Sequence, residues 1–158
     1  MFDTVLGLPV HALVVHAVVV LVPVAALGVA AIAVVPRWRD RYGPLVLAVA
    51  TAGLAMVPVA TLSGSELEDR IGAGGVVKRQ IDEHADLGAL VIYPTAVMWL
   101  LAVALVVMSR RRVGHRALTV VAVLAVLAAG VAAGVVTRVG HLGSTAVWSC
   151  TIGSDACR

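Results

Sequence analysis

The sequence predicts an all-α protein, a polytopic membrane bundle of four helices with both termini on the extracytoplasmic side. Hydrophobic residues make up 61% of the 158 residues and charged residues 13%, whereas a soluble domain carries about 25% charged residues. The apolar residues gather in four runs, each near the roughly 20 residues that cross a bilayer. The arginines concentrate in alternate connections between these runs. Together these observations predict a single membrane domain and leave no room for a second one.

The first run begins at Pro9, which suits the first turn of a helix because its missing N–H is not needed there. Pro23 lies inside this run and is expected to kink the helix. The residues before the run include Asp3 and no lysine or arginine, so we expect a membrane helix and not a cleaved signal peptide. Within a domain of residues 1–158, the helices are expected at about 9–36, 44–62, 76–109 and 116–139.

Two segments are expected outside the membrane, an outer loop at 63–84 and a C-terminal outer tail at 140–158. The loop contains Ser65 followed by Glu68, a capping-box spacing that predicts a short separate helix. The tail contains Cys150 and Cys157, and an oxidising outer compartment favours a disulfide between them.

Charge sorts by connection and predicts the topology. The first and third connections carry seven arginines and one aspartate, a net charge of +6. The remaining charged residues are five basic and eight acidic, a net charge of −3, which together give the +3 of the chain. The positive-inside rule places both arginine-rich connections in the cytoplasm and both termini outside. The basic excess therefore reports topology and gives no support for nucleic-acid binding.

A glycine pair predicts which face of the last helix is buried. Gly130 and Gly134 form a G-x-x-x-G spacing, typical of a face packed closely on a neighbouring helix. Continuing this stripe towards the C-terminus reaches Arg138 and His141. We therefore expect His141 on the buried side of its helix. The sequence contains no evident internal repeat.

Four histidines are expected at one level of the bundle, near its outer face. Counting about 20 residues outward from the cytoplasmic helix ends places His16 at the outer hydrocarbon boundary and His11, His84 and His141 roughly 6 to 9 Å above it. His115 falls elsewhere, in the arginine-rich third connection. Three different helices thus bring imidazoles to one layer.

Imidazole is a common metal ligand and an axial ligand of haem iron. Haem b needs one histidine from each of two helices, so we expect His16 with His84 or His141 as the axial pair, His11 nearby, and Arg138 beside a propionate. A copper or zinc site built from His11, His84 and His141, with His16 as a further candidate ligand, is the alternative. The simplest alternative is that the histidines are solvated or hydrogen-bonded residues without a ligand.

These residues resemble the bacterial four-helix membrane family catalogued as domain of unknown function 2231. The likeness rests on Pro9-Val10-His11, on His16 and His84, and on the segment Gly140-His141-Leu142-Gly143. The family typically reads His-Pro at the first site and Val-His-Phe-Pro at the second. This chain has His11-Ala12 and Val15-His16-Ala17, so both prolines and the phenylalanine are missing. Family members occur beside c-type cytochrome and Rieske-type modules, so the resemblance implies a redox setting and the same four histidines as site residues.

The sequence therefore predicts a protein of the cytoplasmic membrane that binds a redox cofactor, haem b first and copper or zinc second. Electron transfer would connect an extracytoplasmic carrier with a quinone or a respiratory complex. The alternative from another class is a structural or assembly subunit of a membrane complex. We expect an electron-transfer or binding protein and not a catalyst, because no serine or cysteine lies in an activating context. Whether it forms a homo-oligomer stays open.

Overall fold

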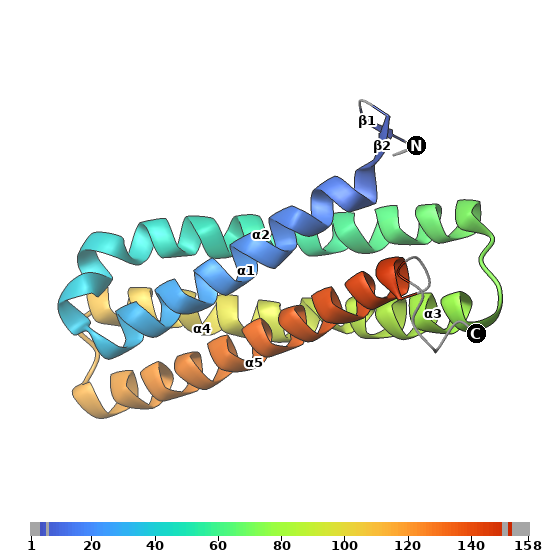
Figure 1. Ribbon diagram of the computed structural model, residues 1–158. Coiled ribbons are helices and arrows are strands. Elements are labelled where there is room, and N and C mark those ends of the chain that lie inside the picture. Colours follow the sequence, from blue (N-terminus) through green and yellow to red (C-terminus); the bar gives the residue numbers. More distant parts are fainter. Residues whose placement is uncertain (1–3, 6, 150–151, 153–158) are drawn as a thin grey trace.

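The chain folds into a bundle of long helices, as the composition predicted (Figure 1). The computed structural model describes residues 4–5, 7–149 and 152. A two-residue strand β1 (Thr4–Val5) pairs antiparallel with β2 (Leu8–Pro9) ahead of the bundle. The helices are α1 (Val10–Val34), α2 (Pro36–Ile71), α3 (Gly75–Leu90), α4 (Ile92–Arg110) and α5 (His115–Trp148).

Four helical segments are long and apolar enough to cross a membrane, which confirms the predicted fold class. They are α1, α2, α5 and the segment from Gly75 to Arg110 that joins α3 to α4. The break between α3 and α4 is a single residue, Val91. Pro94 lies in the first turn of α4 and has no N–H to donate to the carbonyl of Leu90, which explains an interruption at this point.

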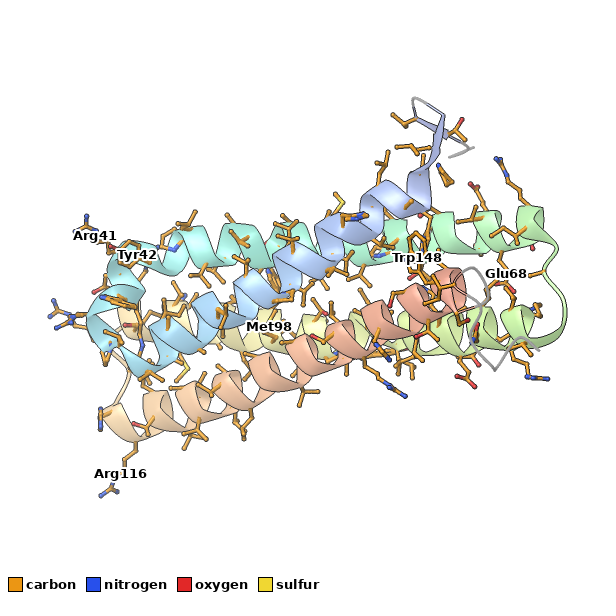
Figure 2. The ribbon with its side chains drawn as sticks, in the orientation of Figure 1. Arg41, Tyr42, Glu68, Met98, Arg116 and Trp148 are labelled. Carbon is orange, nitrogen blue, oxygen red and sulfur yellow. The ribbon has the colours of Figure 1, made fainter. Side chains whose placement is uncertain are left out.

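The four spans pack in a ring, and each contacts two neighbours extensively. α1 packs against α2 and α5, and α4 packs against the same two helices. α1 and the α3–α4 segment therefore occupy one diagonal of the bundle, and α2 and α5 occupy the other. α1 begins and α5 ends at the same end of the bundle (Figure 1). Arg41 and Arg116 lie at the opposite end, far from Glu68 (Figure 2).

The buried positions reveal an internal repeat that the sequence did not. Adding 73 to the residue number takes six of the seven buried residues of α1 to buried residues at Val91 and in α4. Adding 79 takes four of the six buried residues of α2 to buried residues of α5. The first set pairs Val18 with Val91, Val22 with Thr95, Ala25 with Met98, Val29 with Ala102, Ile32 with Leu105 and Ala33 with Val106. The second pairs Gly43 with Ala122, Ala50 with Ala129, Gly53 with Ala132 and Val57 with Val136. The bundle is thus two similar helical hairpins related by a pseudo-twofold axis along its length.

Several predicted boundaries differ from the structure. α2 begins at Pro36, not at residue 44, and continues to Ile71 without a separate short helix. Pro36 starts the helix because proline is accommodated in the first turn, and Gly72 ends it in a left-handed conformation with φ of 57°. α5 extends nine residues beyond the predicted 139, to Trp148. The predicted disulfide of Cys150 and Cys157 lies outside the described residues.

The predicted burial of the G-x-x-x-G face is wrong. Gly130 and Gly134 are both exposed, and a Cβ added at either glycine would meet nothing within 4 Å. The face of α5 that packs into the bundle is instead a stripe of small apolar residues, Ala122, Ala125, Ala129, Ala132 and Val136. Alanine allows the same close approach of helix backbones as glycine in membrane proteins, so the glycine spacing pointed to the wrong side of the helix.

Candidate bis-histidine site

His11 lies in the first turn of α1 and packs against the C-terminal half of α2. Its Nδ1 donates to the backbone carbonyl of Ala60 at 3.0 Å. The ring rests on Gly64, where a Cβ would come within 2.9 Å of the His11 Cε1 atom. Because Nδ1 carries the proton in this hydrogen bond, Nε2 is left with a free lone pair.

His84 in α3 repeats this arrangement on α5. Its Nδ1 donates to the carbonyl of Val139 at 3.0 Å. A Cβ at Gly143 would lie 2.9 Å from the His84 Cε1 atom. In both halves the glycine follows the accepting residue by four positions, one helical turn, so it exposes the backbone on the same face of the helix.

The pseudo-twofold repeat brings the two imidazoles together. His11 and His84 are 73 residues apart, Ala60 and Val139 are 79 apart, and so are Gly64 and Gly143, the same offsets that relate the buried core. The ring centroids of His11 and His84 are 6.2 Å apart with planes inclined at 78°. Two imidazoles that share one metal ion at the usual distance of about 2.0–2.1 Å have centroids roughly 6 Å apart.

The hydrogen bonds of this pair resemble those that orient metal-ligating histidines. A ligating histidine typically donates its other ring N–H to a carboxylate, a backbone carbonyl or water, which fixes the tautomer and the ring orientation. His11 and His84 each make such a bond to a carbonyl on a different helix. Both rings are half-buried, so their positions are fixed by packing as well as by hydrogen bonds.

The other two outer histidines lie apart from this pair. The His16 side chain is exposed, and its Nδ1 donates to the Ala12 carbonyl in its own helix. His141 and Arg138 are also exposed, so the predicted burial of His141 is wrong. His141 and Arg138 continue the exposed face of α5 that carries Gly130 and Gly134. The opposite, alanine-rich face of α5 packs into the bundle. The structure therefore brings together His11 and His84 and leaves His16, His141 and Arg138 outside.

A three-histidine copper or zinc site is not assembled in the described part of the chain. Within residues 4–5, 7–149 and 152, no group of three or more His, Cys, Asp or Glu side chains is placed to hold a metal ion. His115 lies at the first position of α5, at the arginine-rich end, as the sequence predicted. The described residues thus bring two imidazoles, those of His11 and His84, close together at the end of the bundle where α1 begins.

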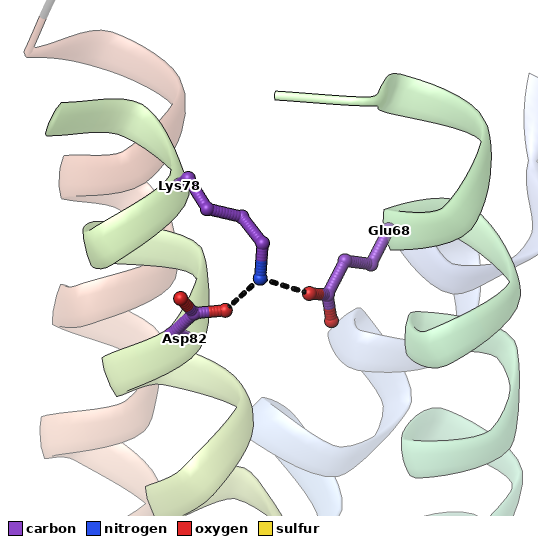
Figure 3. Close-up of polar contacts among 3 residues, drawn as sticks. All are labelled: Glu68, Lys78 and Asp82. Carbon is purple, nitrogen blue, oxygen red and sulfur yellow. Dashed lines mark hydrogen bonds and ion pairs between the residues drawn. The ribbon is translucent and has the colours of Figure 1, made fainter. Parts of the chain in front are cut away.

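Charged groups surround the pair at the rim of the bundle. Lys78 in α3 donates to Glu68 of α2 at 2.8 Å and also to Asp82, one turn further along α3 (Figure 3). This bridge ties the two hairpins together six residues from His84. Beside His11, a small cavity of about 10 Å³ is bordered by Ser63, Glu66 and Arg70. Its volume accommodates about one water molecule.

Comparison with known sequences identifies the family of the chain. Residues 7–156 match the family described as predicted membrane protein, DUF2231. The chain belongs to this family. The match covers both hairpins of the DUF2231 protein, including His11, His84 and their glycine partners, and it confirms the family resemblance found in the sequence. Neither the curated proteins nor the solved structures include a match to this chain.

The site also contains features that the sequence analysis missed. Ala60, Gly64 and Val139 were not candidates, although they hold the two rings. The sequence did contain one regularity that pointed to them. Gly64 and Gly143 each lie on the helix that follows a histidine-bearing helix. The pairing became apparent only when the two offsets of the repeat were known.

Proposed function

We propose that this DUF2231 protein is a redox protein of the cytoplasmic membrane that binds haem b through His11 and His84. The observation that carries the proposal is the pairing of two carbonyl-oriented imidazoles, 6.2 Å apart, from opposite helices of the bundle. Histidine pairs of this kind suit the two axial positions of haem iron. This pair replaces the pair expected from the sequence, because the His16 side chain is exposed.

Room for a large flat ligand has to come from movement of the helix ends. Gly64 and Gly143 let the two imidazoles lie directly against the backbones of α2 and α5, so the space beside these glycines is filled by the rings. The cavity beside His11 is water-sized, so binding requires the outer helix ends to part. On this diagonal the buried positions begin at Val18 and Val91, each about two turns further into the bundle. Parting the ends therefore leaves the core intact.

The proposed electron path follows from the charge distribution. The arginine-rich end belongs in the cytoplasm by the positive-inside rule, which puts the histidine pair at the extracytoplasmic face. Electrons would pass there between an extracytoplasmic carrier and a quinone or respiratory complex in the membrane. Arg138 is exposed and precedes Val139, whose carbonyl holds His84. Its guanidinium is our candidate partner for a propionate.

The test is an absorption spectrum with metal analysis of detergent-purified protein, oxidised and then reduced with dithionite. We expect a Soret band with sharp reduced α and β bands, lost in His11→Ala and in His84→Ala. The matched controls are His16→Ala and His141→Ala, which remove exposed imidazoles at the same end and should keep the spectrum. Stoichiometric copper or zinc without these bands would overturn haem b in favour of a metal held by the pair. Protein that carries neither, when purified with added haem, would favour an assembly subunit.

A second pair of variants tests the geometry without removing an imidazole. Gly64→Ala and Gly143→Ala each place a methyl group 2.9 Å from a ring atom, so the ring must move from its carbonyl. We expect either change to weaken haem retention and to shift the reduced α band. Gly130→Ala is the control, because its added methyl group meets nothing within 4 Å. An unchanged spectrum in both variants, with normal folding, would contradict the proposed axial pair.

A further inference from the structure

An apolar groove lies at the arginine-rich end of the bundle, remote from the histidine pair. Its volume is about 570 Å³, and it runs between the end of α1, the start of α2 and the first turns of α5. Val34, Val123 and Leu127 line it and are exposed at 70%, 54% and 60% of their surface. In a membrane helix such exposed apolar side chains face lipid tails, so the groove opens sideways into the bilayer.

The mouth of the groove is polar, and arginines flank it. Arg39 and His115 line it together with Pro36 and Thr119, but the Arg39 guanidinium is already bonded to the carbonyls of Ile32 and Ala33. Arg37 and Arg116 follow Pro36 and His115 in the sequence, and the connections at this end carry seven arginines and one aspartate. An anion at this mouth therefore finds complementary charge within one helical turn of the apolar lining.

Two helices also begin at this mouth. α2 starts at Pro36, which has no N–H, and the Trp38 N–H already donates to the carbonyl of Val35 at 2.9 Å. α5 starts at His115, and Gly114 before it makes no side-chain capping hydrogen bond. The first N–H groups of a helix lack partners within the helix and carry the positive end of its dipole. An uncapped helix start such as that of α5 is suited to a phosphate group. The groove thus combines an apolar slot with a mouth that favours an anion.

We propose that this groove binds an anionic phospholipid of the cytoplasmic leaflet. One acyl chain lies along Val34, Val123 and Leu127, and the phosphate sits at the start of α5 beside His115 and Arg116. Basic pockets between helices on the cytoplasmic side are suited to such headgroups. The net positive charge of the mouth favours this ligand over a neutral lipid or a quinone of similar length. The inference is independent of the haem proposal, because the groove lies at the other end of the bundle.

The experiment is native mass spectrometry of the full-length protein released from mixed micelles of phosphatidylglycerol and phosphatidylcholine. We expect one tightly held phosphatidylglycerol, preferred over phosphatidylcholine by about fivefold or more, the effect of roughly one favourable charge at a membrane surface. Thr119→Glu places a negative charge in the groove and should abolish the preference. Thr119→Gln is the matched control, since it has nearly the same size without the charge and should retain most of the preference.

Three results would overturn the inference. Equal retention of the two lipids by the wild-type protein would show that the groove does not select charge. Equal retention of phosphatidylglycerol by the Thr119→Glu and Thr119→Gln variants would place the bound lipid elsewhere on the protein. A quinone that co-purifies with the wild-type protein and is lost from the Thr119→Gln variant would assign the groove to a neutral ligand. The wild-type comparison does not depend on the folding of either variant.

Discussion

At the scale of single residues, Arg39 has a structural role that its neighbours lack. Its side chain is 6% exposed, whereas Arg37 beside it is exposed. Nε donates to the carbonyl of Ile32 at 2.7 Å and Nη2 donates to that of Ala33 at 2.6 Å. Both carbonyls lie in the last turn of α1, where no further N–H is available to them. Arg39 therefore closes the end of α1 and holds it against the start of α2.

Arg39→Ala should lower the stability of the protein in detergent by about 2 kcal/mol, because two carbonyls lose a charged donor in a buried setting. The measurement is the midpoint of thermal unfolding followed by circular dichroism. Arg37→Ala removes the same charge from an exposed position and should leave the midpoint nearly unchanged. Equal midpoints for the two variants would mean that the capping bonds of Arg39 contribute no stability.

This residue also marks a limit of sequence reasoning. In the sequence, Arg39 counts as one of seven arginines that predict topology, and nothing in its spacing separates it from Arg37 or Arg41. The distinction depends on the turn at Val35, which folds the start of α2 back onto the end of α1. The histidines behave similarly. Helix length predicted that the four histidines lie at a similar height in the bundle. Which of them face each other depends on the rotation of each helix about its own axis, and the sequence did not predict that rotation.

At the scale of helices, the spans are longer than a membrane requires. α2 has 36 residues and α5 has 34, so each is about 50 Å long against a hydrocarbon thickness of about 30 Å. Hydropathy predicted the four long apolar helices but ended these two near residues 62 and 139, where the apolar residues end. The polar turns beyond those points are also helical, and Lys78 of α3, which bonds Asp82 on its own helix, joins α3 to Glu68 near the end of α2. These projecting turns carry Gly64 and Gly143, and hence the candidate site.

The turn between α2 and α3 sets how these projecting ends meet. Gly72 has φ of 57°, a conformation that costs other residues roughly 1 kcal/mol. Gly72→Ala should therefore destabilise the protein by about that amount in chemical unfolding in detergent. Gly74→Ala is the control, because Gly74 has φ of −128° and a Cβ there meets nothing within 4 Å. An equal loss of stability in the two variants would argue against a conformational cause.

At the scale of the whole molecule, the pseudo-twofold repeat explains why one histidine comes from each hairpin. The two offsets, 73 and 79, differ by six for two reasons. α4 continues three residues beyond Val107, the equivalent of the last residue of α1, and the four-residue connection from α4 to α5 is three residues longer than the single-residue connection from α1 to α2. The matched core residues also differ in identity, as Val22 and Thr95 do. A length change and divergent side chains hide the repeat from the sequence, although the burial pattern retains it. Both hairpins start at the same end, so the axis runs along the membrane normal, as in parallel repeats.

Because both histidine-bearing helix ends lie at the same end of the bundle, only two topologies are possible. Both ends face the extracytoplasmic side, or both face the cytoplasm. The positive-inside rule assigns them to the extracytoplasmic side. Alkaline phosphatase fused after Trp148 should then be active in a bacterial host, and the same enzyme fused after Arg112 should be inactive. Green fluorescent protein fused at the same two positions is the control, because it fluoresces when cytoplasmic and should give the reverse pattern. If Trp148 instead reported the cytoplasm, the His11–His84 pair would face the cytosol, the proposed extracytoplasmic electron carrier would have no access to it, and the groove at the arginine-rich end would open to the outer leaflet.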